Sequence, residues 1–301
     1  MRSALAVLTA CLVAVSTSPT EAKPRTSQEA RAQPIVIGTS YTLESTHLAE
    51  ARQINVWTPS THGADGRRFK VLYVLDGGLA QDFQHVAGLG QLGDLSWTFE
   101  PLIVVGVETR DRRSDLTQPP TDPRFRTAFP SAGGADAFRR FLAEEVIPFV
   151  EARHPASDHR ALAGESLAGL FVVDTLLNAP ELFDDYFAIS PSLWWDDQRL
   201  ARAAGERLRQ GDFARRRLWL AIADEGGTMQ EGVDRLRRAI EATPGGPALS
   251  YVDRSSTETH ATIYHGALLE GLRAFYGTPY EGGSETPWYM SADGVPPEPN
   301  D

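Results

Sequence analysis

The chain has 301 residues, with 29 Lys and Arg against 40 Asp and Glu, and its formal net charge is −11. Nucleic acids and anionic membranes are bound through clustered cations, so this acidic balance argues against both as the main partner. Hydrophobic residues make up 42% of the chain and charged residues 23%, which excludes a wholly disordered or collagen-like protein.

The N-terminus has the pattern of a cleaved secretory signal. Arg2 precedes an apolar run, Ala4–Val15, that is too short to span a bilayer. Small residues at Thr20 and Ala22 predict cleavage after Ala22, and hence a periplasmic or secreted protein with no membrane contact after cleavage. A lipoprotein site at Cys11, the single cysteine, is the alternative. It fits less well, because few residues precede Cys11 and the apolar run continues past it.

Composition divides the rest of the chain into three parts. Residues 23–34 are polar and predict a flexible linker. Residues 35–280 show no repeat of fixed period and predict one domain. Residues 281–301 are rich in Gly, Pro and acidic residues, which predicts a loosely ordered tail.

Short apolar runs alternate with longer amphipathic stretches within the predicted domain. Strands are predicted at Ile35–Ile37 running on to Leu43, Ile54–Trp57, Val71–Leu75, Leu102–Val107, Ala161–Ala163, Tyr186–Ile189, Leu218–Ala223 and Leu249–Val252. Helices are predicted at Asp136–Ala152, Leu167–Asn178, Thr228–Ala242 and His265–Tyr276. Several strands are apolar on both faces, as parallel strands covered on both sides are. This alternation predicts an α/β three-layer sandwich, with a mostly parallel eight-stranded sheet and helices on both faces.

The most informative motif is Gly164-Glu165-Ser166-Leu167-Ala168, between a predicted strand and an apolar helix. A sharp strand-to-helix turn of this kind, with small residues two before and two after the serine, exposes a nucleophile in serine hydrolases. The alternative is a plain connection in which Ser166 caps the following helix.

A nucleophilic serine needs a base, and in this arrangement the order is serine, acid, histidine. Only His260 and His265 follow Ser166. His260 lies in a polar loop after the last predicted strand, where it can reach the strand ends, whereas His265 falls in the first turn of the final helix. His260 is therefore the predicted base, with a solvated loop histidine as the alternative.

The acid that orients the base should follow the next-to-last strand. Asp224 and Glu225 both follow Leu218–Ala223 directly, and their spacing does not separate them. Either carboxylate would also suit the N-terminus of a helix before Thr228.

Acyl transfer also requires donors for an oxyanion. The N–H group of Leu167, directly after the serine, is one predicted donor. The second is expected in the loop after the third strand, where Gly77 is the first candidate and Gly78 the reserve, because glycine permits close backbone approach. A glycine turn that serves only the connection is the alternative.

Several segments, in this order, resemble the esterase D-like esterases of the α/β-hydrolase superfamily. They are Val71–Gly77, Ile103–Val107 followed by Arg110–Thr117, Ser131–Ala135, the motif around Ser166, and Ser190–Trp195. That family includes siderophore esterases of the enterobactin type, feruloyl and other carbohydrate-linked acyl esterases, and mycolyl transferases. The resemblance implies an α/β-hydrolase fold and a Ser–acid–His enzyme that acts on small-molecule esters without a metal or organic cofactor.

The resemblance also bears on individual residues. Secreted relatives similar to siderophore esterases often have glutamate after this strand, which favours Glu225 over Asp224. The family usually has His and Gly where this chain has Glu165 and Ala168. Alanine is small enough for its place, while Glu165 puts a charge beside the nucleophile, where it would disfavour anionic substrates or tune the base.

Two further groups of residues are candidates for substrate binding. Arg110, Arg112 and Arg113 follow a strand at the end where open α/β sheets bind ligands, and Arg112 is the first candidate for an anionic group. An ion-pair cluster with Asp111 and Asp115 is the equal alternative. Of the tryptophans after the next strand, Trp194 is expected in the site and Trp195 in the core.

These observations predict a secreted or periplasmic serine carboxylic-ester hydrolase that works through an acyl-enzyme, and the siderophore-esterase type is one form of it. An acyltransferase on the same fold is the first alternative, since it forms the same acyl-enzyme. A binding protein that keeps the fold without catalysis is the second.

Overall fold

The computed structural model describes residues 31–61, 66–96, 98–278 and 294–295. The chain divides between Val36 and Ile37 into two units, and the larger contains every described helix and strand. The predicted signal peptide, most of the predicted linker and nearly all of the predicted tail lie outside the described residues. Within the described ranges, no helix is long and apolar enough to cross a membrane.

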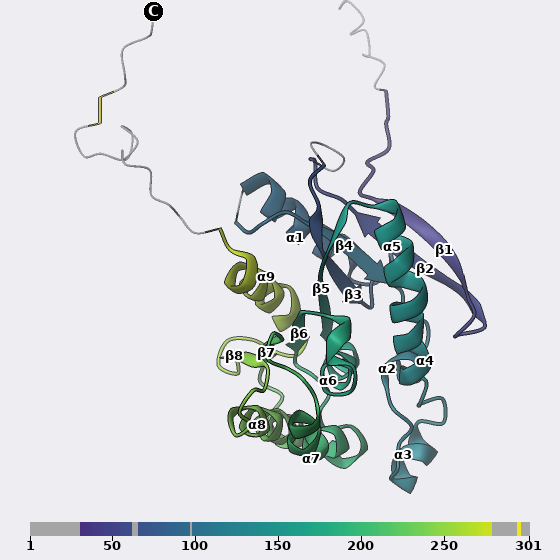
Figure 1. Ribbon diagram of the computed structural model, residues 1–301, viewed down its shortest axis with the longest axis vertical. Coiled ribbons are helices and arrows are strands. Elements are labelled where there is room, and N and C mark those ends of the chain that lie inside the picture. Colours follow the sequence, from purple (N-terminus) through teal and green to yellow (C-terminus); the bar gives the residue numbers. More distant parts are fainter. Residues whose placement is uncertain (1–30, 62–65, 97, 279–293, 296–301) are drawn as a thin grey trace, which may run out of the picture. The chain divides into compact units, whose positions relative to one another are not determined.

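Eight strands form one sheet in the order β1-β2-β4-β3-β5-β6-β7-β8 (Figure 1). Their bounds are β1 Thr39–Ser45, β2 Glu50–Trp57, β3 Phe69–Leu75, β4 Leu102–Val107, β5 Ala156–Glu165, β6 Asp185–Ile189, β7 Arg217–Ile222 and β8 Ala248–Asp253. The β1–β2 and β2–β4 pairs are antiparallel, and all other pairs are parallel. The mostly parallel eight-stranded sheet predicted from the apolar runs is therefore confirmed.

The first strand begins later than its sequence suggests. Thr39 pairs with Val56, and β2 ends one residue further on, at Trp57. The ladder ends there, and Pro59, two residues further along the chain, has no N–H group with which a longer β2 could continue it. Ile35–Ile37 accordingly lie outside β1, with Ile35 92% exposed, and their apolar character does not make them a strand.

Helices cover both faces of the sheet. The bounds of the longer ones are α1 Phe83–Ser96, α5 Ile147–Arg153, α6 Leu167–Asn178, α7 Trp195–Gln210, α8 Gly227–Glu241 and α9 Ile263–Tyr276, and the shorter ones are α2 Arg112–Leu116, α3 Pro123–Ala128, α4 Ala135–Arg140 and η2 Pro180–Leu182. Along β3, Tyr73 packs in the core beneath α4 to α8, and its neighbours Leu72 and Val74 pack in the core beneath α1 and α9. Successive side chains point to opposite faces, so a strand buried on both sides joins two cores. The three-layer sandwich is thereby confirmed.

The helix predicted over Asp136–Ala152 is present but not uniform. Its middle turns, η1 Phe141–Val146, form a π-helix between α4 and α5. Pro148, two residues after Val146, cannot donate to a carbonyl one turn back, so a widened turn accommodates the missing hydrogen bond. The other three predicted helices are found with starts that differ by two residues at most.

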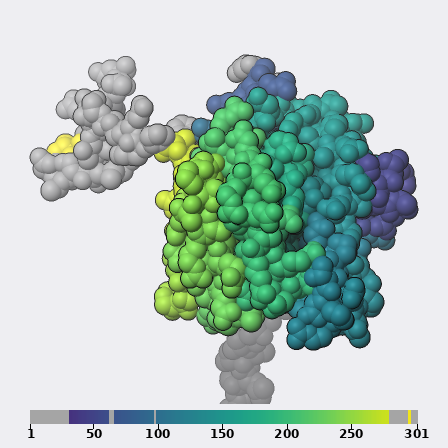
Figure 2. Space-filling model, turned by 60° about the horizontal axis from the view of Figure 1, so that its bottom comes forward, coloured from purple at the N-terminus to yellow at the C-terminus, as the bar shows by residue number. Residues whose placement is uncertain are grey.

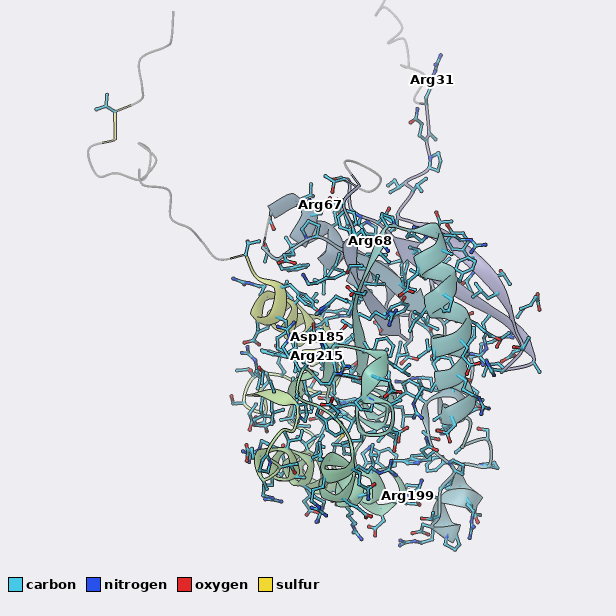
Figure 3. All side chains as sticks on the ribbon, in the orientation of Figure 1. Arg31, Arg67, Arg68, Asp185, Arg199 and Arg215 are labelled. Carbon is cyan, nitrogen blue, oxygen red and sulfur yellow. The ribbon has the colours of Figure 1, made fainter. Side chains whose placement is uncertain are left out.

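A buried carboxylate anchors the amino edge of the sheet, opposite the strand ends that carry the candidate site. Asp185, 1% exposed, accepts hydrogen bonds from His159, Arg217 and Tyr276. Burial opposes ionisation, but the bonds from His159 and Arg217 outweigh it and lower the pKa of Asp185 to about 2. Figure 3 labels Asp185 near Arg215, and both line one polar surface pocket. Asp185 thus ties the end of α9 to the start of β6.

Candidate active site

Ser166 occupies a strained turn between β5 and α6. Its backbone angles are φ 60° and ψ −119°, which are unfavourable for any residue with a Cβ atom. A Cβ atom on Gly164 would lie 2.7 Å from both the Cβ and the carbonyl carbon of Ala168. The small residues on either side of Ser166 are therefore required because the chain folds back on itself there. This is the geometry of a nucleophile elbow.

The segment after β6 holds the elbow in place. The N–H group of Ser166 donates to Ile189 O at 3.1 Å, and the N–H group of Ser192 donates to Ser166 O at 2.9 Å. The hydroxyls of Ser166 and Ser192 lie 3.3 Å apart. The sequence did not single out Ser192, although its place just after the strand beside β5 was the available signal.

His260 and Glu225 lie together at the same edge of the sheet. Nδ1 of His260 is 2.7 Å from Oε1 of Glu225, and Oε2 of Glu225 accepts from the N–H group of Ala223 at 2.9 Å. Asp224, the other candidate acid, is exposed, and its N–H group donates to Glu258 O. Glu225 is thus the carboxylate beside the histidine.

Within the described residues, no hydrogen bond joins Ser166 to His260, and the side-chain neighbour of Ser166 Oγ is Ser192. Catalytic hydrogen bonds are often long or misaligned in an empty site and form when substrate binds. The His260–Glu225 contact uses Nδ1 and leaves Nε2 as the nitrogen that can accept a proton.

The contact between His260 and Glu225 shifts the pKa of each side chain in the direction that a histidine base requires. The hydrogen bond that His260 donates to Glu225 raises the pKa of His260 above its ordinary value, against the opposing effect of burial. Burial of Glu225 would raise its pKa, but the hydrogen bonds that the carboxylate accepts from His260, from Ser190 and from the backbone together outweigh burial and hold that pKa below the usual range. Glu225 therefore stays ionised beside a histidine whose protonated form it stabilises.

The structure corrects the predicted oxyanion donors in part. Leu167 is the first residue of α6, where a helix supplies no acceptor for the N–H group. The N–H group of Gly77 instead donates to Val107 O at 2.8 Å, so it points into the sheet and is not free for a ligand. Gly77 is needed for close packing, because a Cβ there would lie 2.3 Å from the Cα of Gly106. The reserve, Gly78, donates to Oε1 of Gln81, and Nε2 of that side chain donates to the carbonyl and hydroxyl oxygens of Thr109.

Of the three candidate arginines, only Arg112 reaches the elbow. Its guanidinium pairs with Asp76 at 2.9 Å, and Nη2 lies 3.5 Å from Glu165 O. Arg110 pairs with Glu50 at the surface, and Arg113 lies over the ring of Phe129. The alternative cluster with Asp111 and Asp115 is not formed as predicted, because Asp111 caps α2 and Asp115 pairs with Arg52.

An aromatic pocket is formed by α3 and the start of α7. Trp195 is buried and Trp194 is partly exposed, and both pack against Phe125 of α3. The pocket has a volume of ≈ 400 Å³ and is lined by Arg124, Phe125, Ala128, Phe129, Trp194, Asp197, Gln198 and Thr228. In Figure 2, the teal surface that includes α3 meets the green surface that includes α7 on the face turned forward. Two of its lining residues come from segments that carry site residues: Thr228 is three positions after Glu225, and Trp194 is two positions after Ser192, whose N–H group donates to Ser166 O.

Glu165 brings a second carboxyl group to the site. Its Oε1 is buried and has no hydrogen-bond partner within the described part of the chain. Burial raises the pKa of Glu165 to about 7, although the nearby His260, His265 and Arg112 act in the opposite direction. Among the described residues, no group of three or more His, Cys, Asp or Glu side chains is arranged to hold a metal.

Curated relatives match part of the chain. A siderophore enterobactin esterase of Emericella nidulans is 33% identical over 172 residues, which cover 50% of this chain and 57% of that protein. The ferri-bacillibactin esterase BesA of Bacillus subtilis is 36% identical over 110 residues, covering 32% of this chain and 38% of that protein. The chain thus spans little more than half the length of the first relative and less of the second.

Solved structures match over more of the chain. An IroE-like serine hydrolase from Shewanella oneidensis has a TM-score of 0.68 at 27% identity, over 79% of this chain and 80% of that one. The siderophore hydrolase EstB from Aspergillus nidulans has a TM-score of 0.70 at 22% identity, over 83% of this chain and 98% of that one, a likeness that shows the fold alone. Together they confirm the α/β-hydrolase fold. A family model described as "Putative esterase" matches residues 45–266, and the chain belongs to that esterase family.

Proposed function

We propose that the protein is a serine esterase that hydrolyses carboxylic esters through an acyl-enzyme on Ser166. The observation that carries the proposal is the His260–Glu225 contact of 2.7 Å, at the same sheet edge as a serine held in an elbow. Family membership and relatives named as siderophore esterases support it.

Each residue has one role in the proposed reaction. His260 Nε2 takes the hydroxyl proton of Ser166 while Oγ forms a bond to the ester carbonyl carbon, and the carbonyl electron pair moves to oxygen. The N–H groups of Leu167 and Gly78 hold that oxyanion once Gln81 turns away. When the carbonyl re-forms, the ester C–O bond breaks and the leaving alcohol takes the proton from His260. Water then repeats the sequence and releases the acid.

The pocket supports an ester with an aromatic part and an anionic or polar substituent. Phe125, Phe129 and Trp194 offer ring faces, which suit a flat group. Arg112, whose side chain is 42% exposed beside the elbow, offers a cation for a carboxylate or phenolate oxygen. A siderophore ester, as the relatives' names indicate, combines these features and is the proposed substrate type.

The first experiment is labelling with a fluorophosphonate probe, which reacts with activated serines. Wild type is compared with Ser166→Ala and His260→Ala, and Ser157→Ala, at the opposite end of β5, serves as the matched control. Labelling should persist in the control and vanish in the two site variants, and hydrolysis of p-nitrophenyl esters should follow the same pattern. A folded wild type that takes no label would contradict the proposal and favour a binding protein without catalysis.

The proposed location is the periplasm or the exterior of the cell, because of the predicted signal at residues 1–22. Expression of the full chain with fractionation of the culture tests this, and the mass of the exported protein reads the cleavage site. A mature chain beginning at Lys23 is the expected result. Retention of the full-length chain in the cytoplasm would contradict it.

A further inference from the structure

The start of α7 has an unusual backbone. Asp196, Asp197 and Gln198 have φ values of 48°, 55° and 59°, so three successive residues with Cβ atoms lie in the left-handed region. That region is unfavourable for such residues, and a run of three is kept only where the surroundings impose it. The contacts of Asp196 show what imposes it here.

The side chain of Asp196 is 3% exposed and fully bonded. Its carboxylate accepts from the N–H and hydroxyl groups of Thr121, each at 2.9 Å, and from the N–H group of Asp122 at 2.9 Å. Nε of Arg199 lies 3.0 Å from it, and the same guanidinium donates to Pro119 O. Figure 3 labels Arg199 at the lower end of the molecule, between α7 and α3. Apart from the Arg199–Asp196 pair within α7, each of these bonds holds the segment 119–122 that leads into α3.

Helix α3 has little else to hold it. It has six residues and none of its side chains is fully buried. A helix this short is unstable by itself. Ring contacts join it to α7: Phe125 of the helix lies 5.4 Å from Trp195, and Phe129, directly after the helix, lies 5.2 Å from the same ring and beneath Arg113. Because Trp195 directly precedes Asp196, one short segment provides both the rings and the carboxylate that hold α3.

Helix α3 and the residue after it supply half of the lining of the aromatic pocket. We propose that Asp196 is a positioning residue that keeps α3 closed over this pocket, and that it thereby sets the preference of the enzyme for esters with an aromatic group. The proposal rests on the proposed esterase function and adds a residue that determines its specificity. Asp196 acts through α3 and takes no part in the bond-breaking steps.

The arrangement predicts that loss of Asp196 weakens substrate binding without changing the bond-breaking steps. Ser166, Glu225 and His260 follow β5, β7 and β8, whereas Asp196 binds the segment before α3. Loss of Asp196 frees α3 but leaves the elbow and the His260–Glu225 contact in place. Esters that fill the pocket should lose affinity, and esters too small to reach it should react as before.

The test compares KM and kcat for three esters: methyl butanoate, methyl 3-phenylpropanoate and benzyl acetate. In Asp196→Ala, the segment before α3 loses its charge-assisted hydrogen bonds, which are among the strong ones. The freed helix no longer lines the pocket, so KM for at least one aromatic ester should rise about ten-fold. The kinetics of methyl butanoate should not change. Glu206→Gln removes an exposed charge from the same helix and serves as the matched control, with wild-type kinetics on all three esters.

A second readout does not depend on activity. Freeing α3 uncovers Trp195, so the tryptophan emission of Asp196→Ala should shift to longer wavelength while its far-ultraviolet circular dichroism stays native. If Asp196→Ala does not fold, Thr121→Val removes only the hydroxyl bond and should raise the aromatic KM by about two-fold.

The outcomes separate the two proposals. A folded Asp196→Ala protein with unchanged KM for all three esters, or with equal losses on all three, would overturn the positioning role. If the wild type shows no Ser166-dependent hydrolysis, the proposed function fails. The emission shift then still reports whether Asp196 holds α3.

Discussion

The carboxylate of Glu225 lies 2.7 Å from Nδ1 of His260, although 35 positions separate the two residues in the chain. Parallel neighbours bring them together, because β7 pairs with β8 and each residue follows the carboxyl end of its strand. Asp224, one position earlier, is exposed. The direction in which the chain leaves β7, rather than the spacing of the residues, decides which carboxylate meets the histidine.

Exchanging the two acids for amides should therefore have unequal effects. In Glu225→Gln, the ring of His260 loses the carboxylate that orients it and stabilises its cation, and kcat should fall by about 10³- to 10⁴-fold. Asp224→Asn makes the same change in an exposed side chain and should keep wild-type kcat within about two-fold. Steady-state hydrolysis of a p-nitrophenyl ester measures both. Comparable losses in the two variants would rule out Glu225 as the single orienting acid.

Crowding at the elbow predicts a second result. In Gly164→Ala, the new methyl group would lie 2.7 Å from Ala168 and should destabilise the protein by about 1–3 kcal/mol. Part of the crowding comes from the methyl group of Ala168 and part from its backbone. The double variant Gly164→Ala/Ala168→Gly should therefore recover only some of the loss.

Urea unfolding of the two single variants and the double variant measures this coupling. Ala168→Gly by itself is the reference, and it should cost less than about 1 kcal/mol through helix propensity. Additive effects of the two changes would show that residues 164 and 168 do not meet across the turn.

The buried carboxylate at the amino edge predicts a loss of stability in acid. The pKa of Asp185 is lowered from 3.8 to about 2 in the folded state, so its contribution is present in full above pH 3.8 and is lost as the pH falls toward 2. That contribution is about 2 kcal/mol. Asp185→Asn removes one partner of a buried ion pair and should cost about 3–5 kcal/mol near neutral pH.

Chemical denaturation between pH 2 and pH 7 measures this dependence. Asp158→Asn changes an exposed carboxylate that lines the same surface pocket, and it should keep the stability of the wild type. An Asp185→Asn variant as stable as the wild type at pH 7 would show that the ion pair contributes nothing to the fold.

Much of the sheet could be predicted from the sequence because strands buried on both faces are continuous apolar runs, as in β4. Helix α1 could not, because Gly88, Gly90 and Gly93 lower its helix propensity. The structure explains two of these glycines: a Cβ on Gly90 would lie 2.8 Å from Trp57, and one on Gly93 would lie 2.4 Å from Phe99. Close packing overrides local propensity there.

Some residues of the candidate site could likewise be predicted from the sequence, and others could not. Ser166 and His260 could be identified from local pattern and chain order. Gly77 as the first candidate donor was wrong, because its N–H group is bonded to Val107 O. The direction of an N–H group depends on how the loop leaves β3, a property of the backbone that residue type does not encode. Asp196 gave no signal, since its partners, Thr121 and Asp122, are 75 and 74 positions away.

Glu165 predicts how activity depends on pH. The charge of Glu165 raises the pKa of His260, in addition to the larger effect of Glu225. Only neutral His260 can act as a base, so activity is lost as the pH falls through this raised pKa. In Glu165→Gln that contribution is gone, and the acid limb of kcat/KM should move to lower pH. Glu181 is exposed near the amino edge of the sheet, and Glu181→Gln should leave the acid limb of kcat/KM in place.

Burial of Glu165 also predicts that the folded state becomes less stable as the pH rises. Its pKa is raised from 4.5 to about 7 in the folded state. Below pH 4.5 the carboxyl group is protonated in both the folded and unfolded states, and no cost arises. Between pH 4.5 and 7 the unfolded state releases the proton more readily, so the folded state loses up to about 3 kcal/mol by neutral pH. Glu165→Gln should therefore unfold at higher urea concentration than the wild type at pH 8 and at nearly the same concentration at pH 4.5. A variant less stable than the wild type at pH 8 would mean that the buried carboxylate has a stabilising partner and that burial is not its dominant effect.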